Sequence, residues 1–497
     1  MKIKNLLAVL APLALTVATL FGTASCSKDF IDLRDPTRIP TDEAYRDSLS
    51  FVNGVTAAYS SLQDIYGRNA TNVGLFLFTE VASDNSTAVV TDLNQVGDFE
   101  TFSFSANNPR IQAQWLATYR SIARCNLVLN RLPAAPLRDT TKNRFSAELK
   151  FIRALAYFNA VQVWGDVPLV TSEISTIGEA YSYGRQPTTA VYAQIEKDLK
   201  EAIRSLPNVY SLSSTADLGR VTRGAARGLL AKVYLTQRKY AEAETSLREF
   251  LAVYDNGIYA LQPNYANIFL TSNEMNSEII FAVRYSKGAL GIGSPFTNYF
   301  APTVAQAGGN GAANQYNNIR RDLVDAFTLS GAADTRGVAS YGGPVLSSVY
   351  YTKKYLDTPT ASYDADNDWI VLRYADVLLM YAEVLNELNR PTEAVPLLNR
   401  VRTRAGLPGL ATSLNQNDLR LAIERDRRLE LNTEGHRWFD LVRTGRAIAV
   451  MNAHFTRYSI TLAGSPVTID AHNLVFPIPL QEIQVNPALT QNPGYTN

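Results

Sequence analysis

The stretch that decides the fold is residues 372–408, LRYADVLLMYAEVLNELNRPTEAVPLLNRVRTRAGLP. Apolar side chains recur every three or four residues along its first half, which is the spacing of a helix that buries one face. A second periodic run follows at 391–406. The stretch therefore predicts two helices joined by a short turn. The apolar positions of the first helix are Tyr374, Ala375, Leu378, Ala382 and Leu385.

A second copy of this helical hairpin lies earlier in the chain, and a third, partial copy begins at Ala154. Small residues stand twelve positions apart in both complete copies, a spacing at which two antiparallel helices approach closely across a tight turn. The pattern is that of tetratricopeptide units interrupted by insertions. The matching positions are Ala231, Tyr234, Tyr240, Ala243 and Leu247 in the earlier copy, and Ala382, Leu385, Pro391, Ala394 and Leu398 in the later one.

Helical periodicity also dominates the rest of the chain. Strand–helix units of about 30 residues do not alternate, which argues against a parallel α/β sheet. We therefore expect an all-α (mainly helical) fold, a tetratricopeptide-like helical hairpin scaffold whose long loop insertions form the ligand site. The further periodic stretches are 47–66, 109–132, 142–164, 188–206, 221–237, 239–254, 416–432 and 434–448.

Two stretches have the composition of loops. Residues 69–108 contain scattered Thr and Ser, and residues 284–360 contain GALGIGS, AGGNGAANQYNN and YGGPVLSSVYY. The second stretch is too long for an ordinary connection, so it is either functional or poorly ordered. Insertions in a repeat scaffold are where binding residues gather.

The bulk composition excludes some classes of protein. The 497 residues suffice for one large domain or two closely packed ones. The formal charge is +1, whereas a nucleic-acid-binding protein gathers a basic excess on one face. The 26 Tyr and 20 Phe against 4 Trp suit helix packing, and Tyr-rich surfaces also suit sugars or peptides. We expect no nucleic-acid partner.

The N-terminus has the layout of a lipoprotein leader. Lys2 and Lys4 precede an apolar run at 6–20, small residues follow at 22–25, and Cys26 comes next. The run is short for a membrane span, which takes about 20 apolar residues. A cysteine directly after the cleavage site can receive the several acyl chains that anchor a protein stably. We therefore expect a lipoprotein signal peptide at 1–25 and lipidation at Cys26, with simple secretion as the alternative.

No sequence pattern for catalysis, metal binding or a cofactor stands out. The glycines at 308–311 lack the Lys-Ser/Thr of a phosphate loop. His-Glu-x-x-His, Cys-x-x-Cys and Gly-x-Ser-x-Gly do not occur, and the three histidines are scattered. The acidic residues are numerous enough for a glycosidase pair, but their helical context disfavours one. We expect neither an enzyme nor a cofactor.

The densest charged run is ERDRRLELNTEGHRWFDL at 424–441. A polar site here would use Glu424, Arg425, Asp426 and Arg428. The structural interpretation pairs Glu424 with Arg428 at i and i+4 on one helix and buries the apolar side chains. We favour the structural interpretation. The apolar side chains are Leu429, Leu431, Trp438, Phe439 and Leu441.

Four segments, in this order, resemble the SusD/RagB-like outer-membrane nutrient-binding lipoproteins. They are FIRALAYFNAVQVWGDVPLV at 151–170, the stretch at 372–408, IERDRRLELNTEGHRWFDLVRTG at 423–445 and FPIPLQEIQVNPALTQNPGY at 476–495. With the leader, the resemblance extends over essentially the whole mature chain. It implies a SusD-like N-terminal helical region at 26–240 and a RagB/SusD C-terminal region at 275–497, packed together as one globular unit.

The resemblance also implies a function. A member of this family would be lipid-anchored in the outer membrane and face outside. It would capture an oligomeric nutrient, in the first place a glycan, and deliver it to a SusC-like TonB-dependent transporter, while neighbouring enzymes do any cutting. The alternatives are a peptide-capturing lid of the same transporter type, a helical-repeat scaffold that binds only another protein, and a surface hydrolase.

The ligand residues are less clearly implied by the resemblance. All four Trp lie in segments that have the pattern of scaffold, so Tyr or Phe would have to supply a stacking face for a sugar. A Trp-free groove rich in Tyr and Asn equally fits a peptide. The candidates are Phe76, Asp84 and Asn85 in the first insertion, and Tyr285, Tyr299, Asn314, Tyr316 and Tyr341 in the second.

Overall fold

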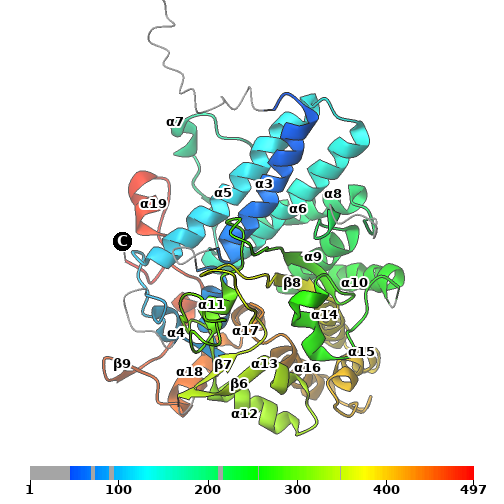
Figure 1. Cartoon of the computed structure of the whole chain (residues 1–497), viewed down its shortest axis with the longest axis vertical. Coiled ribbons are helices and arrows are strands. Elements are labelled where there is room, and N and C mark those ends of the chain that lie inside the picture. The colour runs from blue at the N-terminus through cyan, green and yellow to red at the C-terminus, as the bar shows by residue number, and fades with distance from the viewer. Residues whose placement is uncertain are drawn as a thin grey trace, which may run out of the picture.

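The chain folds into helices with a few short strands, as the sequence predicts (Figure 1). The computed structural model describes residues 45–68, 73–88, 95–210, 217–255, 257–346 and 349–496. The helices are α3 (Ser48–Tyr66), α4 (Asp98–Thr101), α5 (Pro109–Arg131), α6 (Asp139–Trp164), α7 (Ile177–Ala180), α8 (Thr188–Ser205), α9 (Arg223–Thr236), α10 (Tyr240–Tyr254), α11 (Phe296–Phe300), α12 (Arg321–Ser330), α13 (Arg336–Ser340), α14 (Tyr374–Glu387), α15 (Pro391–Arg404), α16 (Gln416–Glu430), α17 (Arg437–Arg443), α18 (Ala447–Arg457) and α19 (Leu480–Val485). The strands are β1 (Ser86–Thr87), β2 (Val167–Pro168), β3 (Arg185–Gln186), β4 (Ile279–Val283), β5 (Asn318–Arg320), β6 (Tyr341–Leu346), β7 (Val349–Thr352), β8 (Trp369–Arg373), β9 (Thr461–Leu462) and β10 (Ser465–Pro466).

The two predicted helical hairpins are present as α9–α10 and α14–α15. The alanines that define each repeat are fully buried. Each turn passes through one left-handed residue, Arg238 with φ 58° in the first hairpin and Asn389 with φ 59° in the second. The two copies therefore match in the backbone conformation of the turn as well as in sequence. The partial copy at Ala154 differs, because α6 reaches its partner α8 through residues 165–187 instead of a tight turn.

The helices α3, α5, α6 and α8 pack in sequence order and lie side by side in Figure 1. Helix α5 begins where the sequence provides for a start. The Asn108 side chain accepts a hydrogen bond from the backbone N–H of Arg110 at 2.9 Å, and Pro109 takes the first helical position. Helix α6 ends at Gly165, whose φ of 71° few other residues adopt without strain.

The prediction of a single helix at 434–448 is wrong. Helix α17 ends at Arg443, and Gly445 has a φ of 74° that breaks the helical path. Helix α18 then starts afresh, so the chain changes direction between α17 and α18. The glycine is visible in the sequence, but apolar periodicity continues across it and hides the break.

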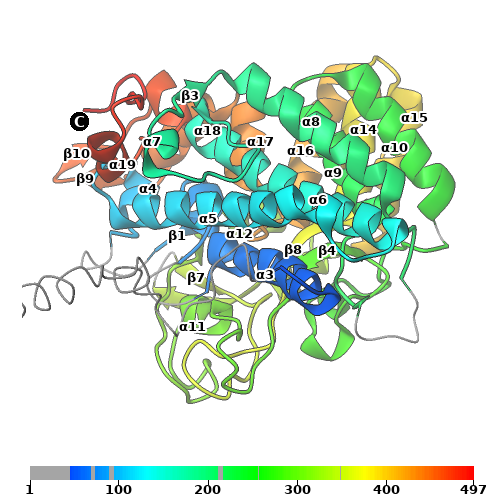
Figure 2. The same ribbon diagram turned by 90° about the horizontal axis from the view of Figure 1, so that it is seen from above.

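The two predicted insertions fold together. Strand β1 of the first pairs antiparallel with β5 of the second, with Ser86 opposite Ile319. The order β1-β5-β7-β6 makes a four-stranded antiparallel sheet from segments far apart in the sequence. The insertion that carries α11 and β7 bulges from one side of the body (Figure 2). The described parts of 284–360 thus have regular elements of their own instead of forming one long loop.

One large apolar cluster extends from Phe51 to Leu489. It takes side chains from both predicted regions, 26–240 and 275–497, whose boundary stays a prediction. None of the described helices is both long enough and apolar enough to cross a membrane.

The C-terminal tail returns to the N-terminal helices. The backbone N–H of Phe476 donates to the carbonyl of Val163 at 2.8 Å. The Asn492 amide donates to the carbonyls of Trp164 and Phe476 at 2.9 and 2.7 Å. These bonds fix the tail against the end of α6.

Candidate ligand-binding site

Aromatic rings fill the base of the second insertion around α11. Phe296 packs against Tyr355 and Trp369, with ring centroids 5.7 and 4.8 Å apart. Tyr355 stacks on Trp369 at 5.2 Å. Tyr299 extends the cluster outward to Tyr316 at 5.6 Å. The insertion thus has an aromatic core of its own, which joins the main core through Trp369.

A buried asparagine fixes the Gly-rich turn of this insertion. The Asn298 side-chain amide donates to the carbonyls of Asn310 and Ala312 at 2.9 and 2.8 Å, and its oxygen accepts from the backbone N–H of Tyr363 at 2.7 Å. The glycines within 308–311 have φ between 72° and 79°, a region that glycine adopts freely. Asn298 therefore holds two separate loop segments in one arrangement.

Asn314, Tyr316 and Tyr363 form a hydrogen-bonded group, the insertion cluster. The Asn314 amide donates to the Tyr316 hydroxyl at 3.3 Å, and the Tyr363 hydroxyl donates to the Asn314 oxygen at 3.1 Å. Asn314 and Tyr363 are partly exposed. Tyr363 and Gln315 have φ of 61° and 55°, which is strained for residues other than glycine and common at ligand sites. A ring, an amide and hydroxyls side by side suit recognition of a sugar.

Arg110, at the start of α5, lies beside the same rings. Burial lowers the pKa of Arg110, and the phenols of Tyr316 and Tyr299 act in the opposite direction. Because α5 begins where the first insertion ends, this guanidinium connects the first insertion to the insertion cluster.

Four of the predicted aromatic candidates are buried side chains in this structure. Phe76 and Tyr299 are 0% exposed, Tyr316 is 2% exposed and Tyr285 is 3% exposed. The Tyr285 hydroxyl donates to the carbonyl of Gly67 at 2.6 Å. An insertion of this length needs a core, and its aromatic residues supply it. Contact between these four residues and a ligand stays a prediction.

Tyr341 lies apart from the insertion cluster, at the start of β6. Its ring is 5.7 Å from that of Phe327 and 5.6 Å from that of Tyr350. It is partly exposed. Of the five candidates in the second insertion, Tyr299, Asn314 and Tyr316 come together, and Tyr341 does not.

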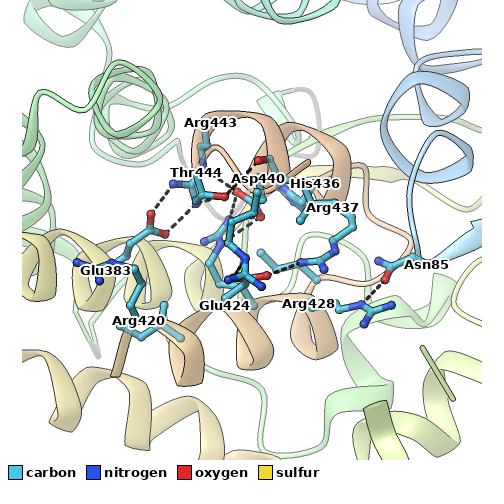
Figure 3. A pocket seen from close by; sticks show the side chains of 15 residues that line it. Asn85, Glu383, Arg420, Glu424, Arg428, His436, Arg437, Asp440, Arg443 and Thr444 are labelled. Carbon is cyan, nitrogen blue, oxygen red and sulfur yellow. Dashed lines mark hydrogen bonds and ion pairs between the residues drawn. The ribbon is translucent and has the colours of Figure 1, made fainter. Parts of the chain in front are cut away.

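Asp84 and Asn85 are buried against arginines of the C-terminal helices. The Asp84 carboxylate accepts from Arg437 Nε at 2.7 Å and Nη2 at 2.8 Å. The Asn85 oxygen accepts from Arg428 Nε at 2.7 Å (Figure 3). Burial raises the pKa of Asp84, but the charges of Arg428 and Arg437 outweigh it and hold the pKa well below its usual range. These two candidates thus bind the first insertion to α16 and α17.

The charged run at 424–441 is partly scaffold and partly the wall of a pocket. The predicted pair between Glu424 and Arg428 is not formed. Glu424 lies 3.4 Å from Arg437 Nη1 and 2.9 Å from Arg446 Nε instead. Glu424, Arg428 and Arg437 line a cavity (Figure 3), whose volume is about 70 Å³. The expected burial of the apolar side chains is confirmed for Leu429, Leu431, Trp438 and Leu441, and Phe439 is half-buried.

Sequence reasoning missed Tyr363 and Arg110. Tyr363 falls just beyond the predicted insertion at 284–360, and Arg110 lies in a helix that has the pattern of scaffold. The signal for Tyr363 was a tyrosine in the polar stretch ASYDADND. No sequence pattern marks Arg110 as part of the site, because only the fold brings it next to Tyr316.

The remaining predictions concern the cysteines and metals. Cys26 lies outside the described residues. Cys125 is buried, and burial raises the pKa of its thiol to about 12, which is typical of a core cysteine and not of a reactive thiol. Within the described ranges, no group of three or more His, Cys, Asp or Glu side chains could hold a metal ion.

Two family models match the chain. One, described as "SusD family", matches residues 339–495, and one described as "Starch-binding associating with outer membrane" matches residues 29–235. SusD-like protein P25 of Formosa agariphila is 29% identical over 100% of this chain and 99% of the relative. A SusD-like protein of Bacteroides ovatus is 25% identical over 96% of each chain.

A solved structure extends the comparison to the fold. A laminarin binding SusD-like protein is 30% identical, covers 91% of this chain and 100% of its own, and superimposes with a TM-score of 0.77. The chain belongs to the SusD/RagB-like family.

Proposed function

We propose that this protein binds an oligosaccharide at the outer surface of the outer membrane and delivers it to a SusC-like TonB-dependent transporter. The observation that carries the proposal is the full-length similarity to a laminarin binding SusD-like protein. The match to a family described as starch-binding and outer-membrane-associated supports it further.

The insertion cluster supports the proposal and is where we propose that the ligand binds. Asn314 and Tyr363 offer an amide, a hydroxyl and a ring edge at a partly exposed position. Polar groups of this kind hydrogen-bond sugar hydroxyls, while the ring covers an apolar face of the sugar. Asn298 holds the loops in place beforehand, so less conformational entropy is lost when a ligand binds.

The proposal includes a lipid anchor at Cys26 and no catalytic step. An anchored capture protein needs to hold its ligand and release it intact. Capture next to a transporter raises the local concentration of the nutrient at the channel mouth, which is useful even when the affinity is modest.

The test is affinity electrophoresis of the mature chain, residues 27–497, in native gels that contain laminarin or another soluble polysaccharide. We expect retardation by at least one neutral glycan and no release of sugar. Asn314→Ala and Tyr363→Phe should weaken retardation, since each removes a hydrogen-bonding group worth about 1 kcal/mol, or roughly fivefold in affinity. Tyr181→Phe is the matched control, because Tyr181 is exposed far from the cluster on the α7 segment.

Other results would contradict the proposal. Retardation by peptides but by no polysaccharide would make the protein a peptide-capturing lid. Release of sugar by the purified chain would make it an enzyme. A failure to bind either class of ligand would favour a scaffold that binds only another protein.

A further inference from the structure

A groove on the α12, α16 and α18 side of the molecule is not used by the insertion cluster. Its lining residues recur at i, i+4 and i+7 on α16 and on α18 and at i and i+4 on α12, so each of the three helices presents one face to it. The open space measures about 370 Å³. The main lining side chains are Leu421, Arg425 and Arg428 on α16, Arg446 directly before α18, and Val450 and Arg457 on α18.

The groove carries an excess of positive charge. It adjoins the pocket of Figure 3, and the two share Glu424, Arg428, Arg437 and Arg446. The groove itself is lined by five arginines and three carboxylates, and Arg457 also pairs with Asp325 outside the lining, which leaves one positive charge in excess. Such a surface attracts anions.

Two of the arginines have guanidinium N–H groups that are available to a ligand. Arg425 is exposed and has no ion pair within the described part of the chain. Arg446 pairs with Glu424 through Nε, at 2.9 Å, and its side chain is 44% exposed. Arg428 and Arg437, in contrast, are occupied by carboxylates deeper in the wall. The groove thus has a fixed charged base and available guanidinium groups at its rim, and a guanidinium matches the two oxygens of a carboxylate or sulfate.

Between the arginines the groove is apolar. Leu421 is 52% exposed, and Val450, Ala326 and Ala453 complete the strip. An exposed leucine flanked by arginines fits a ligand that combines an apolar face with a negative group. A sugar ring that bears a carboxylate or a sulfate ester has this combination.

We infer that this arginine groove is a second ligand subsite, which binds the carboxylate or sulfate group of an acidic glycan. The inference rests on the proposed capture function and gives it a ligand class. The two subsites are connected by a short segment, because Asn314 and Tyr316 lead through β5 directly into α12, whose Asp322 and Ala326 line the groove.

The experiment compares polyanions with a neutral polymer on the mature chain. Native gels would contain polygalacturonate for the carboxylate, dextran sulfate for the sulfate ester, and dextran as the uncharged polymer. The double variant Arg425→Gln/Arg446→Gln removes the available guanidinium groups. The control Arg204→Gln/Arg248→Gln removes the same charge from exposed positions on α8 and α10.

We expect retardation by polygalacturonate, dextran sulfate or both, but not by dextran. The groove variant should weaken it by about tenfold for each arginine lost, the size of a charged hydrogen bond, and the control variant should not. Retardation should also decrease as salt is added. Glu424→Gln should strengthen binding, because it releases Arg446 from its only carboxylate partner in the described chain.

Equal weakening by the two double variants would overturn the inference, since only overall charge would then matter. A lack of retardation by both polygalacturonate and dextran sulfate would overturn it too. Laminarin retardation distinguishes this failure from failure of the capture function. If laminarin binds and polyanions do not, only the groove is wrong, and if polygalacturonate binds through the groove while neutral glycans do not bind, the role given to the insertion cluster is wrong.

Discussion

Two regions of this protein are equally buried but are built from opposite chemistry. Beneath α16, an ion network joins five cationic and five acidic side chains, all nearly inaccessible to solvent. Beneath α11, rings pack against rings with few hydrogen bonds. The ion network comprises Arg336, Lys354, Arg373, Arg402, Arg404, Glu278, Asp334, Asp426, Glu430 and Glu434.

The difference between charged and aromatic packing corresponds to the different roles of the two regions, scaffold and proposed ligand site. Charged hydrogen bonds are directional, so the ion network fixes β8, α13, α15, α16 and the residue before β4 in one arrangement. Aromatic packing depends less on direction and leaves polar ring edges and hydroxyl groups at its boundary. That boundary is where the insertion cluster lies. The scaffold is therefore specified by charge, and the proposed ligand site grows out of an aromatic core.

The largest effect should come from removing a single charge of the network. Arg373 donates to Glu278, Glu430 and Glu434 at 2.7 to 3.0 Å. Arg373→Met would leave buried carboxylates without compensation, and we expect the free energy of unfolding to fall by about 3–5 kcal/mol. Urea denaturation followed by circular dichroism measures this change.

An exposed arginine provides the control for that prediction. Arg390 pairs with Glu393 on the surface of α15, and its side chain is 38% exposed. Arg390→Met should cost less than about 1 kcal/mol, because surface ion pairs are screened by solvent. Equal losses for the two variants would mean that the network does not specify the scaffold.

A pH series separates carboxylates that have cationic partners from those that do not. Glu80 is buried next to backbone N–H groups of Gly435 and His436, and burial raises its pKa to about 7. Burial also disfavours the charge of Glu430, but the arginines around it lower its pKa to about 2. The two carboxylates are equally buried, so the sign of the shift depends on the partners.

The two shifts predict opposite pH dependence. A raised folded-state pKa means that the contribution of Glu80 is full below its usual pKa and is lost as the pH rises through about 7. The contribution of Glu430 is present above its usual pKa and is lost as the pH falls toward about 2. The ionisation of Glu80 should lower the free energy of unfolding by up to about 3 kcal/mol between pH 5 and pH 8. Glu80→Gln cannot ionise, so we expect this part of the loss to be absent in the variant.

Urea midpoints across that pH range provide the measurement. Glu242→Gln is the matched control, since Glu242 is exposed on α10. Parallel pH profiles for Glu80→Gln and the unmodified chain would show that Glu80 is ionised in the folded protein, contrary to its lack of a directly bound cation.

The insertion should lose function at a smaller cost in stability. Asn298→Ala leaves the carbonyls of Asn310 and Ala312 and the backbone N–H of Tyr363 without this partner. We expect the free energy of unfolding to fall by about 1–3 kcal/mol and laminarin retardation to be lost, because both loop segments become free to move.

Asn314→Ala, in contrast, should weaken binding while leaving the urea midpoint within error. Undiminished binding by Asn298→Ala would place the ligand outside the insertion cluster.

The scaffold was predictable because its signals are local. Ala382 and Ala394 stand within one short stretch, and their spacing alone indicates two helices in close contact. The turn residue Asn389, whose positive φ is a structural finding, lies in the same stretch. Most helix boundaries were predicted within a few residues for this reason.

The site was less predictable because its contacts are distant in the sequence. Nothing local indicates that β1 pairs with β5, so the burial of Phe76 and Tyr316 could not be inferred. A tyrosine in a Gly-rich stretch suits a surface and a small core equally well. The partners of Glu424 were also hidden, because Gly445 turns α18 back and brings Arg446 nearer than Arg428.

The smallest expected effect comes from removing one tyrosine hydroxyl group from each region. The Tyr265 hydroxyl donates to the carbonyl of Glu430 inside the ion network. The Tyr355 hydroxyl, in the aromatic core, is buried without a hydrogen-bond partner among the described residues. Tyr265→Phe should therefore cost about 1 kcal/mol, and Tyr355→Phe should be neutral or stabilise the fold by up to about 1 kcal/mol.

Urea denaturation curves of both variants measure the change in the free energy of unfolding, and the comparison is between the signs of the two changes. Opposite signs would show that the Tyr265 hydroxyl is satisfied in the network and that the Tyr355 hydroxyl is merely tolerated in the aromatic core. A cost of about 1 kcal/mol for Tyr355→Phe would mean that its hydroxyl does find a partner. The small cavity of about 20 Å³ that Tyr355 lines has room for one water molecule, and such a water would make the aromatic core a hydrogen-bonded region too.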